Sequence, residues 1–106
     1  MTSFDKREEG FEKKFAHDEE LKFKAEARRN KLLGLWAADQ QGMSGDAASA
    51  YAREVVAADF EEAGDGVFRK VTADLSARDI AVTEAQIRAK MDELLTQAIA
   101  QVKAGT

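Results

Sequence analysis

Apolar residues recur at helical spacing along most of the chain. The clearest early pattern runs from Leu21 to about Gln41, where apolar positions fall on one face of an α-helix. Glycine and serine interrupt the pattern between Gly42 and Gly45. The sequence therefore predicts a first amphipathic helix that ends near Gln41. The residues of its apolar face are Leu21, Ala25, Leu32, Leu33 and Trp36.

The same pattern predicts three further helices, over residues 47–63, 67–78 and 84–103. Ser44 or Asp46 suits the N-cap of the second helix, and Asp65 suits that of the third. The fourth helix has the clearest start, because Thr83 and Gln86 stand three residues apart as a capping box. The apolar positions are Tyr51, Val55, Val56 and Phe60 in the second helix, Val67, Phe68, Val71 and Leu75 in the third, and Ile87, Met91, Leu94, Leu95, Ala98 and Val102 in the fourth.

Four amphipathic segments joined by short connections predict an all-α fold, a four-helix bundle. Its second to fourth helices should pack around the apolar face of the first, and the long first helix should project beyond them. We divide the chain into an N-terminal segment, residues 1–20, and a bundle domain, residues 21–106. Gly34 lies between large apolar residues of the first helix, where a glycine can permit a close helix crossing.

The N-terminal segment carries Phe4, Phe11 and Phe15, whose spacings of seven and four residues place them on one helical stripe. Most other residues up to Glu20 are charged, and Gly10 costs a helix about 1 kcal/mol relative to alanine. We expect this segment to be frayed or disordered in the free protein and to fold on a partner. The alternative is that it extends the first helix and packs Phe15 on the bundle.

Composition narrows the possible functions. The net charge of −4 argues against a nucleic-acid binder, which needs clustered positive charge. The absence of cysteine excludes disulfides and thiolate metal sites. No apolar run is long enough to span a membrane, and the charged N-terminus is unlike a signal peptide. We therefore expect a protein that folds in water, is not inserted in a membrane and stays in the compartment where it is made.

Two groups of charged residues are weak candidates for chemistry. His17 is the only histidine and lies beside three acidic residues, so it is either a pH-responsive group or, more simply, a solvated side chain. Residues Asp59, Glu61, Glu62 and Asp65 offer oxygen ligands to a divalent cation, but their spacing matches no calcium loop. Solvated charges around a turn are favoured there, and no metal site is predicted.

Basic residues crowd the start of the first helix: Lys22, Lys24, Arg28, Arg29 and Lys31. They wrap around the helix instead of forming a stripe, which favours a polar surface over a phosphate or nucleotide contact. Trp36 is expected in the core. We find no nucleophile elbow, no phosphate-binding glycine loop and no convincing pair of catalytic carboxylates, so an enzyme is not predicted.

Long stretches of the sequence resemble one protein family. AHDEELKFKAEARRNKLLGLWAA, YAREVVAADFEEAGDGVFRKV, SFDKREEGFEKKF and IRAKM are similar to segments of the zeta subunit, the ATPase-inhibitor family of alphaproteobacterial F1FO-ATP synthases. The resemblance covers nearly the whole chain. It implies a four-helix bundle that blocks ATP hydrolysis by inserting its N-terminal segment at a catalytic interface of F1, as a steric block that needs no catalytic residue.

By this resemblance the partners are the alpha, beta and gamma subunits of F1, and the protein is cytoplasmic, peripheral on the inner-membrane ATP synthase. Lys6 stands where the family often has an acidic residue, and Gly10 raises the cost of ordering the segment. The residues that map onto the inhibitory segment are Phe4, Asp5, Lys6, Arg7, Glu8, Glu9, Phe11, Glu12, Lys13, Lys14 and Phe15.

The resemblance leaves a second function open. Some family members bind adenine nucleotides, so weak binding of ATP or ADP is an alternative, with a regulatory or structural role on the ATP synthase. No other cofactor is expected. The candidate phosphate contacts are Arg28, Arg29 and Lys31.

Overall fold

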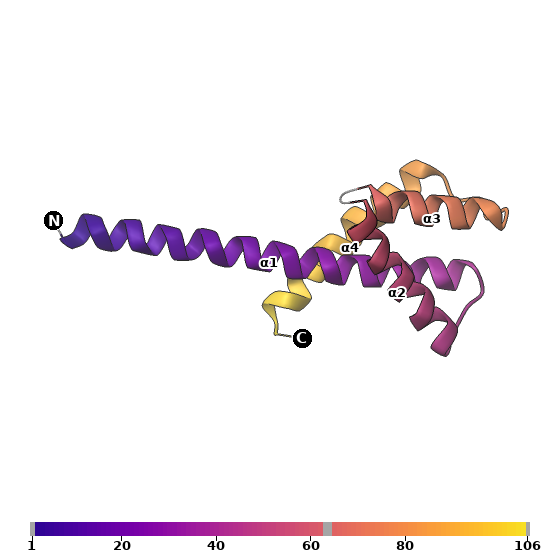
Figure 1. The fold of residues 1–106 in the computed structure, drawn as a ribbon, viewed down its shortest axis with the longest axis horizontal. Helices are drawn as coiled ribbons and strands as arrows, with labels where there is room; N and C mark the ends of the chain where they lie inside the picture. The colour runs from indigo at the N-terminus through magenta and orange to yellow at the C-terminus, as the bar shows by residue number, and fades with distance from the viewer. Residues whose placement is uncertain (1, 63–64, 106) are drawn as a thin grey trace.

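The computed structural model describes the backbone of residues 2–62 and 65–105 and the side chains of residues 19–62 and 65–105. The described backbone forms four helices and no strand, so the predicted all-α fold is confirmed. The helices are α1 (Thr2–Gln40), α2 (Gly45–Glu61), α3 (Gly66–Ala77) and α4 (Glu84–Lys103) (Figure 1).

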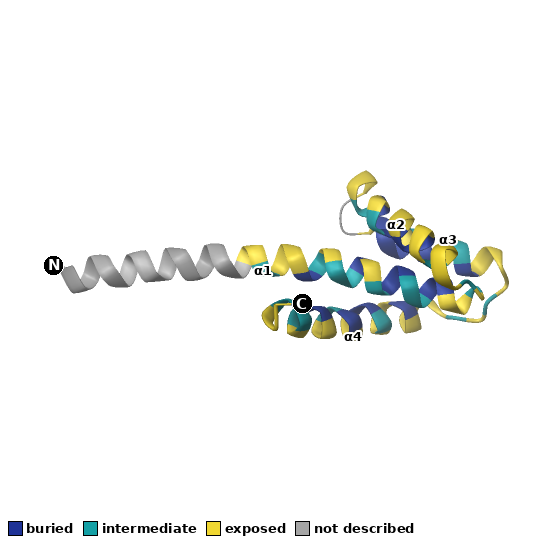
Figure 2. Cartoon of the chain, turned by 90° about the horizontal axis from the view of Figure 1, so that it is seen from below, coloured by how far each residue is buried: buried dark blue, intermediate teal, exposed yellow. Residues whose placement is uncertain are grey.

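The four helices are arranged around the C-terminal half of α1. Helix α2 crosses α1, and α4 runs back along α1 in the opposite direction, so that the C-terminus lies beside the middle of α1 (Figures 1 and 2). Helix α3 packs mainly on α2 and also contacts α1 and α4. The second half of α1 is therefore held from more than one side, as the apolar face from Leu21 to Trp36 predicted.

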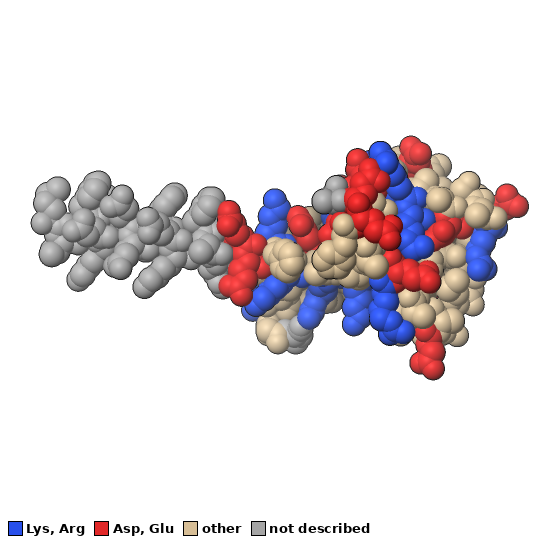
Figure 3. All heavy atoms as spheres, viewed as in Figure 1, with Lys and Arg blue, Asp and Glu red and all other residues tan. Residues whose placement is uncertain are grey.

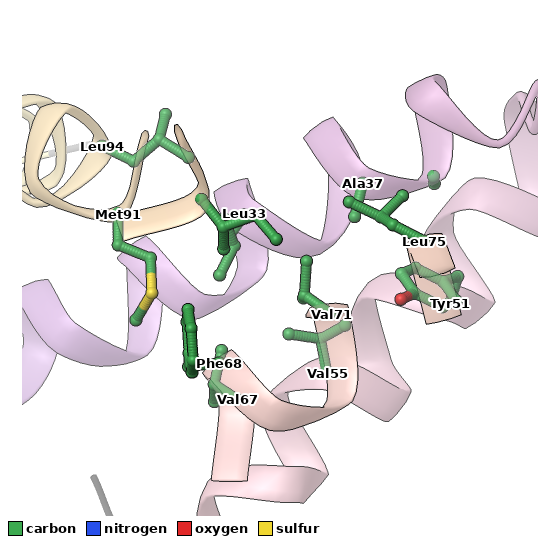
Figure 4. Close-up of a cluster of buried hydrophobic side chains, with 12 residues drawn as sticks. Leu33, Ala37, Tyr51, Val55, Val67, Phe68, Val71, Leu75, Met91 and Leu94 are labelled. Carbon is green, nitrogen blue, oxygen red and sulfur yellow. The ribbon is translucent and has the colours of Figure 1, made fainter. Parts of the chain in front are cut away.

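The core forms where side chains of all four helices meet. In Figure 4, Leu33 of α1 and Met91 of α4 point toward the same interior as Val71 of α3 and Val55 of α2. Burying such side chains stabilises a fold by about 1.5–3 kcal/mol each. The buried cluster comprises Leu33, Ala37, Ala38, Tyr51, Val55, Val67, Phe68, Val71, Leu75, Ile87, Met91 and Leu94.

Gly34 permits the close crossing of α1 and α2. A Cβ atom at this position would lie 2.7 Å from the Cα atom of Ala52, which is too close for any real side chain. Val55 would also be within 3.2 Å of that Cβ. The suggestion that Gly34 allows two helices to approach is confirmed, and the neighbouring helix is α2.

Phe60 lies on the surface, and Leu32 and Trp36 are only partly buried against the core. Phe60 is 83% exposed, so its assignment to the apolar face of the second helix is wrong. The five residues from Val55 to Phe60 turn the helix by about 140° beyond one full turn, which carries Phe60 off the buried face. Trp36 is half-buried and packs against the edge of the core, with the Nζ atom of Lys90 5.8 Å from its ring centroid.

The helix ends agree closely with the pattern of capping residues. Helix α4 has the predicted bounds, and Thr83 and Gln86 form the capping box through bonds of 3.1 and 2.8 Å. The predicted bounds of α2 and α3 and the predicted C-terminal end of α1 lie within two residues of the observed ones, whereas α1 begins at Thr2 and not at the predicted Leu21. Ser44 and Asp65 occupy the N-cap positions of α2 and α3, but neither side chain makes a capping hydrogen bond.

Candidate protein-binding surfaces

The predicted inhibitory segment, Phe4 to Phe15, lies on the N-terminal part of α1, and its side chains are outside the described residues. The same is true of His17. The contacts of these side chains, the mobility of residues 1–20 in the free protein and the division at residue 21 therefore stay predictions.

The bundle fixes the C-terminal half of the helix that carries this segment. Ala25, Leu33 and Ala37 of α1 are completely buried, and each small or branched side chain packs without access to solvent. Because α1 is one helix from Thr2 to Gln40, its packed half sets the direction of the axis on which the N-terminal residues lie.

The three predicted phosphate contacts are not brought together. The Nη1 atom of Arg28 donates to Oε1 of Gln101 on α4 at 3.4 Å. Arg29 donates from Nε and Nη2 to Oδ1 of Asn30, at 3.1 and 3.0 Å. Lys31 instead lines a groove between α1 and α2.

The groove at Lys31 is also lined by a second basic residue, which the sequence analysis did not single out. Arg53 of α2 lines it, together with apolar atoms of Leu35 and Val56. The groove has a volume of about 500 Å³. Arg53 was not among the candidates because it is 22 positions from Lys31 along the chain and only the crossing of α1 and α2 places the two in one groove.

A polar network ties α2 to α3. The Oη atom of Tyr51 donates to Oδ2 of Asp74 at 2.8 Å, and Lys70 Nζ lies 3.1 Å from the same carboxylate oxygen. Lys70 also reaches Glu54 at 3.7 Å and lies 5.3 Å from the Tyr51 ring centroid. Burial, together with the neighbouring Asp74 carboxylate, raises the pKa of Tyr51 above its ordinary value. The network holds the two helices together.

The acidic residues around the connection between α2 and α3 are partly used in ion pairs. Glu62 contacts Arg69 at 2.6 Å, and Asp65 lies 3.9 Å from Arg88. The guanidinium carbon of Arg88 lies 3.8 Å from the centroid of the Phe68 ring. Within residues 19–62 and 65–105, no three acidic or histidine side chains gather as they would around a metal ion.

Two exposed phenylalanines form a surface that the sequence pattern did not predict. Phe23 of α1 is 71% exposed and Phe60 of α2 is 83% exposed, and both line one shallow depression. On the face where α2 crosses α1, Figure 3 shows uncharged side chains with acidic ones above and to their left and basic ones below. The depression is lined by Phe23, Glu26, Ala27, Asn30, Val56, Asp59 and Phe60.

Comparison with known proteins places the chain in a family. The family model of the ATPase inhibitor subunit zeta matches residues 1–101. The chain belongs to the zeta family. A solved protein described as a solution NMR structure is 54% identical, with a TM-score of 0.70, and the match covers 81% of this chain and 99% of that one. Among curated proteins, no match is found.

Membership of the zeta family confirms the resemblance found in the sequence and gives the chain the role of an ATPase inhibitor subunit. It also implies F1-ATPase as the partner. The described helices include none that is both long and apolar enough to cross a membrane. The candidate sites in this zeta-family chain are the N-terminal part of α1 and the exposed phenylalanines of the bundle.

Proposed function

We propose that this chain inhibits ATP hydrolysis by inserting the N-terminal part of α1 at a catalytic interface of F1. The observation that carries the proposal is the match of the zeta-family model, which includes the N-terminal segment as well as the bundle. The extension of α1 to Thr2 supports this proposal, because a helix that is packed in a bundle at one end can enter a cleft of a partner with its other end.

In this mechanism the residues from Phe4 to Phe15 fill space between the alpha, beta and gamma subunits and prevent the interface from closing. Phe4, Phe11 and Phe15 supply the apolar anchors, and the charged residues between them pair with the walls of the cleft. The block is steric, so no residue of this chain takes part in bond making or breaking.

The test is ATP hydrolysis by purified F1 that lacks its own zeta subunit, titrated with the full chain and with a chain lacking Met1 to Phe15. The full chain should reduce hydrolysis and the truncated chain should not. Circular dichroism of the truncated chain checks that the bundle remains folded. Equal inhibition by both proteins would contradict the proposed segment, and no inhibition by either would contradict the proposed function.

A second candidate function is weak binding of ATP or ADP in the groove between α1 and α2. The supporting observation is that Lys31 and Arg53 line this groove beside Leu35 and Val56. The two cations could contact the phosphates, and the two apolar side chains could contact the base. Of the three residues predicted from the sequence, only Lys31 is in the groove.

This alternative predicts that millimolar ATP shifts the backbone amide resonances around Lys31 and Arg53. Replacing either cation with alanine should remove those shifts, whereas Lys103→Ala at the end of α4 should leave them. A titration that moves no resonance, or moves only those around Arg28, would exclude the groove as the nucleotide site.

A further inference from the structure

Phe23 and Phe60 are the large apolar side chains that remain exposed in the described part of the chain. They come from different helices and line the same depression, which Ala27 and Val56 also line. Both aromatic rings are exposed to water. Contiguous exposed apolar surface on a folded protein commonly marks a protein-binding site. The four side chains are named here the phenylalanine patch.

Charge around the phenylalanine patch restricts its partner. Glu26 and Asp59 line the depression itself, and Glu61 follows Phe60 at the exposed end of α2. None of these three carboxylates is within an ion-pairing distance of a described cation. A complementary surface would combine an apolar side chain with lysine or arginine, because acidic or purely apolar neighbours would leave carboxylates buried without partners.

The position of the patch on α1 indicates where that surface lies. Phe23 follows Phe15 by eight residues on the same helix, which is about 12 Å along the axis. If residues 4–15 are inserted in a cleft of F1, the phenylalanine patch lies at the entrance of that cleft. The rim of the cleft is therefore within reach of Phe23 and of Phe60 on the adjoining helix.

We propose that the phenylalanine patch is a second docking surface for F1, which binds a basic and apolar surface at the rim of the cleft that receives the N-terminal segment. This inference rests on the proposed function. It assigns separate tasks to the two surfaces: the N-terminal segment stops hydrolysis, and the patch lengthens the lifetime of the complex.

The test uses full-length variants and two measurements on F1 without its own zeta subunit: the dissociation constant by biolayer interferometry and residual hydrolysis at saturation. Phe23→Ala with Phe60→Ala should raise the dissociation constant about tenfold or more through faster dissociation, with unchanged residual hydrolysis at saturation. Alanine is the best helix former and both rings are exposed, so the bundle should stay folded. Phe11→Ala with Phe15→Ala should instead raise the residual hydrolysis.

A charge-matched pair of variants tests the partner chemistry. Glu26→Lys, in the patch, should weaken binding, whereas Asp92→Lys, at an exposed position on α4, should leave it unchanged. Unchanged affinity of the double phenylalanine variant, in a chain that does inhibit, would overturn the inference and leave the proposed function standing. Failure of the full chain to inhibit would overturn the proposed function itself.

A further measurement tests whether a second copy of this chain, instead of F1, covers the phenylalanine patch. Sedimentation velocity at the assay concentration should show a monomer for both the natural chain and the double phenylalanine variant. A dimer of the natural chain that the double variant abolishes would overturn the inference, because a second copy of the chain would then cover the patch.

Discussion

At the scale of single residues, Tyr51 shows how one polar atom fixes the packing of two helices. Its ring is 6% exposed in the core, while its hydroxyl reaches Asp74 on α3 at 2.8 Å. Lys70 places its charge beside the same carboxylate at 3.1 Å. A buried hydroxyl must find a partner, and a charged acceptor makes the stronger bond. The Tyr51 to Asp74 bond therefore joins α2 to α3 beside their apolar contacts.

Tyr51→Phe should lower the free energy of unfolding by about 1.5–3 kcal/mol, since it removes a hydrogen bond to a charged group and leaves the ring in place. Urea unfolding followed by circular dichroism measures the change. Asp74→Asn is the companion variant, and in a double-mutant cycle the two effects should be clearly less than additive. Full additivity would mean that the bond contributes nothing to stability.

Alkaline pH should reveal the same interaction. Burial, with the neighbouring Asp74 carboxylate, raises the pKa of Tyr51 above its ordinary value. The folded protein then keeps the phenolic proton at a pH where the unfolded chain, with a pKa of about 10, has lost it. This contribution to stability is complete below about pH 10 and is lost as the pH rises through the higher folded-state pKa.

The measurement is the urea midpoint of the natural chain and of Tyr51→Phe between pH 8 and pH 11. Tyr51 is the only ionisable group that differs between the two proteins, so the difference between their stabilities isolates the tyrosine. The gap in stability should narrow above about pH 10. A gap that stays constant to pH 11 would show that the folded and unfolded states bind this proton equally.

At the scale of helices, the ends are secured to different degrees. Helix α4 begins with a complete capping box, in which Thr83 accepts from the Gln86 amide and Gln86 accepts from the Thr83 amide. Helix α2 begins after Ser44, whose side chain makes no capping bond although serine favours this position. Residue type alone therefore does not tell which caps contribute to stability.

Thr83→Ala should destabilise the protein by about 1 kcal/mol, whereas Ser44→Ala, a matched change at the other N-cap, should have little effect. Chemical denaturation measures both, and hydrogen exchange of the first turn of α4 should be faster only in Thr83→Ala. An equal loss of stability in the two variants would contradict the difference between the caps.

At the scale of the whole molecule, the described core begins well after the N-terminal segment. Its buried apolar residues extend from Ala25 to Ala98 and draw on all four helices. The described core therefore holds the bundle together through contacts that begin in the middle of α1. The proposed insertion of the N-terminal segment requires a bundle that folds through such contacts.

Removal of Met1 to Phe15 should change the free energy of unfolding by less than about 0.5 kcal/mol, in line with substitutions away from the core. Removal of α4 should prevent cooperative unfolding, because it takes Ile87, Met91 and Leu94 from the buried cluster. Thermal and urea unfolding of the two truncated chains check both expectations. A large loss of stability in the first chain would show that the N-terminal segment packs on the bundle.

The candidate sites were predictable only where they are local in sequence. The spacing of Phe4, Phe11 and Phe15 is visible in the sequence and predicted a segment that folds on a partner, and the family resemblance assigned inhibition to it. Both stay predictions. Arg53 joins Lys31, and Phe60 joins Phe23, only through the crossing of α1 and α2. No local pattern encodes such a pair, because each partner belongs to a different helix.

The sequence by itself determined the helices and the family. Apolar spacing, glycine breaks and the Thr83 capping box depend on neighbours within a few residues. They predicted the second to fourth helices to within two residues of their observed ends, and the first helix to within one residue of its C-terminal end. Long stretches of residues around Ala25 and Tyr51 were enough to indicate the zeta family, which the family model confirmed.

Only the tertiary structure decided which side of each helix is covered. Phe60 is a large apolar residue but lies outside, whereas Tyr51, Ala52 and Val55 of the same helix are buried. Phe23 of α1 and Phe60 of α2 are exposed and line one depression. The rotation of a helix about its axis depends on residues distant in the sequence, and for that reason the second surface is visible only in the folded protein.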